Sequence, residues 1–500
     1  MKRIAIILSL TSSPALAEIT PMDVIENWRT VYAGLGEVIS YGSLQAGPDG
    51  KSVLLSDVSS TAIMGATTFR IHFDWVQMQP APDGGILISF SPDAEKLDVT
   101  RFPDGTETTI TAQLDLSALT LVATGFPSDI RYSYSAPQIT YSEEQGDEDS
   151  SSRTEITITD LSGEETAITN VTESGPRVAD FGEYHFGKVE IRNESASIMG
   201  LSSVTQIVAN DILLIYRWEF PLTDIPASPV PMADLPPQVD LMMEVQTGKL
   251  SGTIDTESLL GSDMLSFEQE SGSGSLRFAQ NRLRFEMVSN GSTLGMKSSA
   301  PKLPRFELRL ADLRTQITMP FRRAPNATPF SAALSLSGLA LDETSWASVD
   351  PENSMGRPTA ELSISVSGLM KLAYGIFESE AGLENTGSPL FIPDLTVDAL
   401  RIAVADAMIE GNGNLRFSPL RSDPNTDLPM AKGALDFSIT GALGFLDRFG
   451  RLTSVEPMAI LAAKGGLGMF ASPTDAPDSF TSRVEFMSGG GIVINGQTVR

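Results

Sequence analysis

Apolar residues in this 500-residue chain change from a helical spacing near the start to a strand spacing over most of the remaining sequence. One helical face is formed by four apolar residues: Val24, Trp28, Val31 and Leu35. Thr20 is a candidate N-cap and Pro21 suits the first helical position, while Gly34 or Gly36 can end the helix in the left-handed conformation. The pattern predicts a short helix that docks onto a β-sheet core.

After Gly36 the apolar period becomes two, which is typical of half-buried strands. Three turns share a Pro-Asp-Gly motif, at residues 48–50, 82–84 and 103–105. Proline presets φ at the corner and glycine accepts a positive φ. Strand-like segments cover residues 53–55, 69–76, 86–90, 108–114, 156–159 and 189–191. These signals predict an antiparallel meander with one polar face.

A proline-rich segment at residues 221–237 blocks both helix and central strand. We interpret it as a linker or crossover between a β-rich module at 18–220 and a second one at 238–500. In the second module, alternation at 276–278 and 283–287 predicts two paired strands that turn near Asn281. The predicted fold class is therefore mainly β, with extended and curved antiparallel sheets.

The C-terminal part combines two helices, at about residues 443–470, with a final hairpin. The first helix covers 443–449 and ends at Gly450, and Ser454 can cap the second. The second helix has an apolar stripe made of Met458, Leu461, Ala462, Gly465, Gly466, Met469 and Phe470. A strand at 480–486 is expected to turn at Gly489–Gly491 and pair with residues 492–494.

The first 17 residues have the order of a secretory signal peptide. Lys2 and Arg3 precede a short apolar stretch at 4–10, and Ala15-Leu16-Ala17 is a small-x-small cleavage site. We expect cleavage after Ala17 and a periplasmic mature protein. No later segment reaches the ~20 apolar residues that a membrane-spanning helix needs.

These ends of the chain resemble a family of bacterial envelope proteins called "domain of unknown function 2125". The resemblance rests on the signal peptide, the Trp28 helix and the tail Leu467-Gly468-Met469-Phe470-Ala471 with the later Ile494-Asn495-Gly496-Gln497. At the level of fold, the β-rich body is also similar to AsmA-like envelope proteins. That analogy implies curved sheets and lipid handling between membranes, and it does not indicate a reaction.

Composition excludes several classes of chemistry. The chain has no cysteine, which excludes disulfides, thiolate catalysis and cysteine-bound metal clusters. Its net charge of −28 disfavours binding to nucleic acid phosphates. With two histidines, His72 and His185, a histidine-rich metal or catalytic centre cannot form.

Candidate chemical motifs are few. His72 shares a strand face with Arg70 and Asp74, which could form an acid/base pair but is more often a polar cross-strand row. Ser299 and Lys302 match a Ser-x-x-Lys spacing, although Pro301 argues against the helix that this chemistry requires. The acidic loop that begins at Asp147 only partly fits a calcium loop.

These observations assign no catalytic, cofactor-binding or metal-binding residue. They favour a soluble, exported, non-catalytic envelope protein that binds or scaffolds, with a lipid or an envelope protein as candidate partner. A hydrolase with an unrecognised Asp/Glu site and a purely structural or surface protein are the alternatives.

Overall fold

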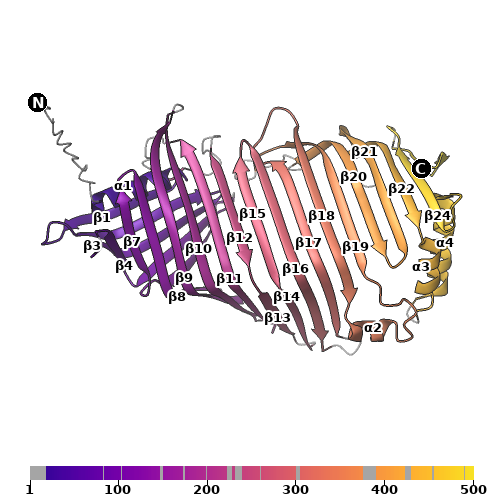
Figure 1. Cartoon of the computed structure of the whole chain (residues 1–500), viewed down its shortest axis with the longest axis horizontal. Coiled ribbons are helices and arrows are strands. Elements are labelled where there is room, and N and C mark those ends of the chain that lie inside the picture. Colours follow the sequence, from indigo (N-terminus) through magenta and orange to yellow (C-terminus); the bar gives the residue numbers. More distant parts are fainter. Residues whose placement is uncertain are drawn as a thin grey trace, which may run out of the picture.

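The computed structural model shows one long antiparallel sheet with helices at its two ends (Figure 1). The strands run across the long axis of the molecule and succeed one another along it. The structure describes residues 19–82, 84–102, 104–146, 150–172, 175–198, 200–221, 228–230, 239–258, 261–299, 305–375, 390–422, 429–452, 455–488 and 490–499. These residues confirm a mainly β fold, since they form a single sheet of 26 strands.

The first half begins with helix α1 (Pro21–Ala33) and continues as consecutive strands. The strands are β1 (Val38–Ala46), β2 (Val53–Met64), β3 (Thr67–Pro80), β4 (Ile86–Phe90), β5 (Asp93–Arg101), β6 (Glu107–Asp115), β7 (Thr120–Phe126), β8 (Asp129–Gly146), β9 (Ser150–Thr172), β10 (Gly175–Ser197) and β11 (Ser202–Pro221).

The second half adds three helices to the remaining strands. The strands are β12 (Asp240–Thr247), β13 (Leu250–Ser258), β14 (Gly261–Gln269), β15 (Ser271–Ala279), β16 (Arg282–Ser298), β17 (Phe306–Pro320), β18 (Thr328–Leu341), β19 (Ala360–Leu372), β20 (Leu390–Val404), β21 (Ala407–Ser422), β22 (Pro429–Thr440), β23 (Ser472–Pro473), β24 (Ser479–Phe486), β25 (Ile492–Ile494) and β26 (Gln497–Thr498). The helices are α2 (Glu343–Val349), α3 (Ala442–Phe449) and α4 (Pro457–Phe470).

The N-terminal helix forms as the sequence predicts. The Thr20 hydroxyl accepts a hydrogen bond from the Asp23 backbone N–H, and the Asp23 carboxylate accepts one from the Thr20 N–H in return. Val24 and Val31 are fully buried against the sheet, and Trp28 stacks on Phe90 and Tyr132. This packing confirms the docking of the helix onto a β core and closes that end of the sheet.

The predicted turns also form. Gly50, Gly84 and Gly105 all have positive φ, as the Pro-Asp-Gly motifs require. The hairpin between β15 and β16 turns at Gln280 and Asn281, and both residues are left-handed. The last hairpin pairs β24 with β25 as predicted, and Val484 lies opposite Ile494.

Strand β11 pairs with both β12 and β13, so the hydrogen-bonded ladder continues from the first half into the second. Within the proline-rich 221–237 segment, only Pro221 and residues 228–230 belong to the described residues. Pro221 ends β11, and the Val230 N–H bonds to the Gly36 carbonyl beside α1. The division into two modules stays a prediction.

The long strands of the first half contain left-handed residues in the middle of their ladders. Asp57, Asp160 and Asp211 have φ between 52° and 56°, and Gly187 of β10 lies opposite Asp160. In β9 the apolar residues Ile156 and Ile158 precede Asp160 at even-numbered positions, whereas Leu161 and the buried Ala167 follow it at odd-numbered positions. The left-handed residue absorbs this offset, so the strand bends while its apolar side chains stay on one face.

That face carries a continuous series of cross-strand partners, which we call the apolar row. In order along the sheet it consists of Tyr132, Glu165, Gly182, Tyr216, Met243, Leu276, Phe285, Ile317, Ala332, Val366, Val397, Gly413, Leu435, Val484 and Ile494. Directly opposed residues of an antiparallel pair point to the same side. Apart from the Glu165 carboxylate, a row of apolar side chains and glycines therefore runs from the α1 core to the last hairpin.

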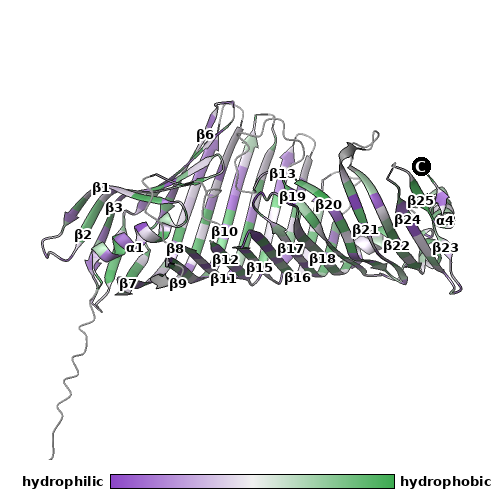
Figure 2. Cartoon of the chain, turned by 90° about the horizontal axis from the view of Figure 1, so that it is seen from above, coloured by the Kyte–Doolittle hydropathy of each residue, from purple (hydrophilic) through white to green (hydrophobic). Residues whose placement is uncertain are grey.

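The neighbouring row on the opposite face is mostly polar. It consists of Arg131, Thr166, Phe181, Arg217, Met242, Arg277, Arg284, Thr318, Ser331, Ser367, Thr396, Asn414, Ala434, Glu485 and Val493. Figure 2 shows the resulting alternation of hydrophobic and hydrophilic residues along the curved strands. Met243 is 38% exposed and Leu294 is 44% exposed, so the middle of the sheet leaves apolar side chains accessible.

Candidate apolar binding site

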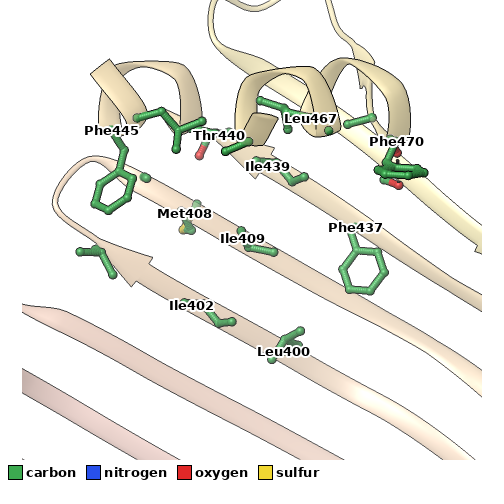
Figure 3. A pocket seen from close by; sticks show the side chains of 18 of the residues that line it. Leu400, Ile402, Met408, Ile409, Phe437, Ile439, Thr440, Phe445, Leu467 and Phe470 are labelled. Atoms are coloured by element: carbon green, nitrogen blue, oxygen red, sulfur yellow. Dashed lines mark hydrogen bonds between the residues drawn. The ribbon is translucent and has the colours of Figure 1, made fainter. Parts of the chain in front are cut away.

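Helices α3 and α4 lie over strands β20, β21 and β22 and form with them an open cavity of about 730 Å³ (Figure 3). The sheet contributes Leu400, Ile402, Met408, Ile409, Phe437, Ile439 and Val484, and the helices contribute Phe445, Leu446, Leu467 and Phe470. No charged side chain lines the cavity among the described residues. Of its hydroxyls, that of Ser482 donates to the Phe470 carbonyl (2.6 Å), so it is not free to bind a ligand.

Helices α3 and α4, which cover the cavity, are stabilised by polar contacts outside it. Asp478 accepts hydrogen bonds from the first free N–H groups of α3, those of Leu443 and Gly444, both at 2.9 Å. Lys464 of α4 pairs with Asp447 of α3 and ties the two helices together. These contacts help to position α3 and α4 over the strands.

Helix α4 differs from the sequence prediction in its start and its packed face. It begins at Pro457 with Glu456 as N-cap, and no side-chain hydrogen bond caps it; Ser454 lies outside the described residues. The predicted stripe points largely outward, because Met458, Leu461 and Met469 are 63–70% exposed. The helix is apolar on several sides, so spacing alone could not identify the side that faces the sheet.

A second chamber of about 300 Å³ adjoins the cavity beneath α2 and α3. It shares Val404 and Phe445 with the first chamber. Its other walls are also apolar: Leu308, Leu339, Leu341, Trp346, Val349, Met355, Phe449 and Leu452 among them. Two adjoining apolar cavities therefore lie at the C-terminal end of the sheet.

The apolar row extends from the cavity to the α1 end of the sheet, where the same face contains buried carboxylates. Val484 belongs both to the cavity wall and to the apolar row. Near α1, the same face contains two buried carboxylates, Glu165 and Asp180. The hydroxyls of Tyr134 and Tyr184 donate to the Glu165 carboxylate, both at 2.8 Å, and the Trp218 indole N–H donates to Asp180.

Asp180 holds its proton more tightly than an ordinary aspartate does. Burial, and then the nearby Glu165 charge, raises the pKa of Asp180 to about 8. Burial also raises the pKa of Tyr184 and of Tyr216, so these phenols stay protonated donors. Glu165, Asp180 and their tyrosine and tryptophan donors thus form a buried polar network at the α1 end of the apolar face.

The candidate motifs from the sequence do not converge on this site. His72 contacts the Ser59 hydroxyl (3.3 Å) and lies 3.6 Å from both Asp57 and Asp74, a half-exposed polar row at the far end of the sheet. His185 is exposed and pairs with Glu183. The Ser299 hydroxyl accepts a hydrogen bond from the Ser262 N–H.

Lys302 and residues 147–149, the start of the predicted acidic loop, lie outside the described residues. The following residues, 150–158, form part of strand β9 and not a loop. The described part of the chain brings no three His, Asp or Glu side chains together in a way that could hold a metal ion. The cavity residues were missed because they come from six separate elements, and no local spacing links them.

No helix among the described residues has the length and hydropathy to cross a membrane. No protein-family model, curated protein or solved structure matches the chain.

Proposed function

We propose that this protein binds an apolar, chain-like ligand, such as the acyl chain of a lipid, in the cavity beneath α3 and α4. The observation that carries the proposal is the uncharged lining of that cavity together with its continuity with the apolar row. Its volume falls within the ~300–1,000 Å³ that is usual for small-molecule sites.

Binding, rather than chemistry, fits the residues around the cavity. General acid/base and nucleophilic catalysis need a titratable or activated group within hydrogen-bond reach of the substrate. The described cavity wall offers aliphatic and aromatic side chains instead. A location outside the cytoplasm agrees with the signal-peptide pattern of the first 17 residues and with the resemblance of the chain ends to bacterial envelope proteins.

Paired substitutions on β22 test the proposal. Ile439 lines the cavity, while the adjacent Ser438 lies on the opposite face of the strand. We expect Ile439→Asp to weaken binding of a fluorescent long-chain fatty acid by at least about tenfold, because a carboxylate would have to be buried with the ligand. Ser438→Asp introduces the same charge and should leave binding unchanged.

Thermal melting of both variants separates binding from folding. The expected result is selective loss of binding in a folded Ile439→Asp protein. Equal affinity in the two variants, or no saturable binding by the unaltered protein, would overturn the proposal.

A further inference from the structure

Charge is distributed unevenly along this acidic chain. Residues 271–341 contain ten Lys or Arg residues and three Asp or Glu residues, against 35 basic and 63 acidic residues in the whole chain. This segment forms β15 to β18 in the middle of the sheet. The centre of the molecule is thus basic, while the rest of the chain is acidic.

Three of these arginines have adjoining backbone positions at one rim of the sheet. Arg282 begins β16 and lies opposite Pro320 at the end of β17. The Phe321 N–H points to the Asn281 carbonyl at 3.4 Å, which holds the next residues of the two strands together. Arg322 and Arg323 come directly after Phe321, so three guanidinium groups extend from adjoining backbone.

The three cations have no acidic partner within the described residues, whereas their neighbours do. Arg277 pairs with Asp240, Arg284 with Glu286, and Arg309 with Glu307. The Nε atom of Arg322 is buried without a hydrogen-bond partner. A buried guanidinium N–H that lacks an acceptor is costly. Neighbouring positive charges also repel one another, so the rim lacks an anionic group that would offset both costs.

The same rim borders the apolar face. The Arg322 guanidinium lies 5.3 Å from the centre of the Phe321 ring, and this ring packs edge-on against Phe278, also at 5.3 Å between centroids. Phe278 lies opposite Leu241 on one side and Leu283 on the other. Phe278 and Leu283 lie on the apolar face, whereas Arg282, two residues before Arg284 of the polar row, lies on the opposite face at the end of β16. Positive charge and apolar surface therefore meet only at the end of this pair of strands.

We infer that Arg282, Arg322 and Arg323 bind the phosphate group of an amphipathic ligand whose apolar part lies on the adjoining face of the sheet. The planar guanidinium fork matches phosphate oxygens, and a phosphate would provide the missing acceptor for Arg322. This inference rests on the proposed binding of acyl chains, and it adds that the ligand carries an anionic head group.

Calorimetric titration of the full chain with a short-chain phosphatidic acid and with the matching diacylglycerol tests the inference. The phosphate-bearing ligand should bind at least about tenfold more tightly, since charged hydrogen bonds are the stronger ones. The variant Arg282→Gln/Arg322→Gln/Arg323→Gln should lose this preference. Arg282→Gln/Arg323→Gln alters exposed residues alone and should lose part of it, even if replacing Arg322 perturbs folding.

The control variant is Arg277→Gln/Arg284→Gln/Arg309→Gln, which removes the same charge from arginines that already have carboxylate partners. It should keep the preference. If the rim and control variants lose the preference equally, the preference depends on overall positive charge, and the assignment of the phosphate site to the three arginines is wrong. Equal binding of both ligands by the unaltered protein would overturn the head-group inference alone, whereas binding of neither would overturn the proposed function as well.

Inorganic phosphate separates the two sources of a phosphate group. Binding of inorganic phosphate that is at least about tenfold weaker than that of the phosphatidic acid supports a lipid head group. Binding of equal strength would assign the rim to the free anion and overturn the lipid assignment.

Discussion

The two halves of this sheet share an alternating strand pattern but differ in how completely their apolar face is buried. From Ile19 to Phe220, 22 apolar residues are buried, and 18 of them form one cluster beneath α1. From residue 239 onward eight described apolar residues are buried, and the one cluster among them has three members, Phe330, Met370 and Leu372. The first half is a packed core, and the second is an accessible apolar surface.

This difference shows that an alternating strand pattern does not fix what covers its apolar side. In the first half α1 covers the sheet, with Trp28 stacked on Phe90 and Tyr132. In the second half α3 and α4 arch over the sheet and leave a cavity. The apolar side chains of the second half remain partly exposed after folding, and their surface is accessible to a ligand.

The largest expected effect comes from matched leucine deletions in the two halves. Leu55 is 1% exposed in the α1 core, whereas Leu276 of the apolar row is half-buried. We expect Leu55→Ala to lower the free energy of unfolding by about 2–5 kcal/mol, and Leu276→Ala by about 1 kcal/mol. Urea denaturation measures both. A Leu276→Ala cost as large as that of Leu55→Ala would show that the middle of the sheet is covered.

The second prediction uses the buried carboxylates that end the apolar face. The folded-state pKa of Asp180 is raised to about 8, above the usual ~3.9 of an unfolded aspartate. The folded form therefore holds a proton that the unfolded form releases, so the contribution of Asp180 to stability is greatest below pH ~4 and falls as pH rises toward 8. The change should amount to a few kcal/mol, on the order of 1.4 kcal/mol per pKa unit before structural relaxation.

Asp180→Asn should flatten this part of the pH profile, since the amide does not titrate. Asp160→Asn is the matched control, because Asp160 is exposed and asparagine tolerates its left-handed φ of 54°. Denaturation midpoints from about pH 4 to 8 provide the measurement. An unchanged slope in Asp180→Asn would show that another group causes the dependence.

Local features of the fold could be predicted from sequence because short-range chemistry determines them. Thr20 with Pro21 predicted the start of α1, and Gly50, Gly84 and Gly105 predicted left-handed turns. The apolar row could not be predicted, because it joins residues as distant as Tyr132 and Ile494 through strand register. Nor could the cavity, since Phe437 and Phe470 meet only after α4 is positioned by its tertiary contacts.

A smaller effect is expected at the strand bends. A Cβ added at Gly187 of β10 would lie 2.9 Å from the Cβ of Asp160, whereas one at Gly274 of β15 would have no neighbour closer than 3.8 Å. We expect Gly187→Ala to cost about 1–3 kcal/mol through overpacking. Gly274→Ala should be neutral or stabilise by about 0.4–1 kcal/mol. Equal changes in melting temperature would mean that the close approach at Asp160 is not part of the bend.

The smallest expected effect concerns the first turns of α1 and α4. Helix α1 has a reciprocal cap between Thr20 and Asp23, while α4 starts at Glu456 with no side-chain cap. Glu456→Asp shortens the side chain so that its carboxylate can accept a bond from the first turn, which should stabilise α4 by about 0.5–1 kcal/mol. Thr20→Ala should destabilise α1 by about 1 kcal/mol, and Thr20→Ser should restore it.

Amide hydrogen exchange resolves these caps better than global unfolding, because frayed helix ends open locally. We expect slower exchange at residues 458–461 in Glu456→Asp and faster exchange near Asp23 in Thr20→Ala. Since α4 is the roof of the cavity, Glu456→Asp should also slow the release of a bound fatty acid. Faster release from a better-capped α4 would contradict the role of this helix as the cover of the site.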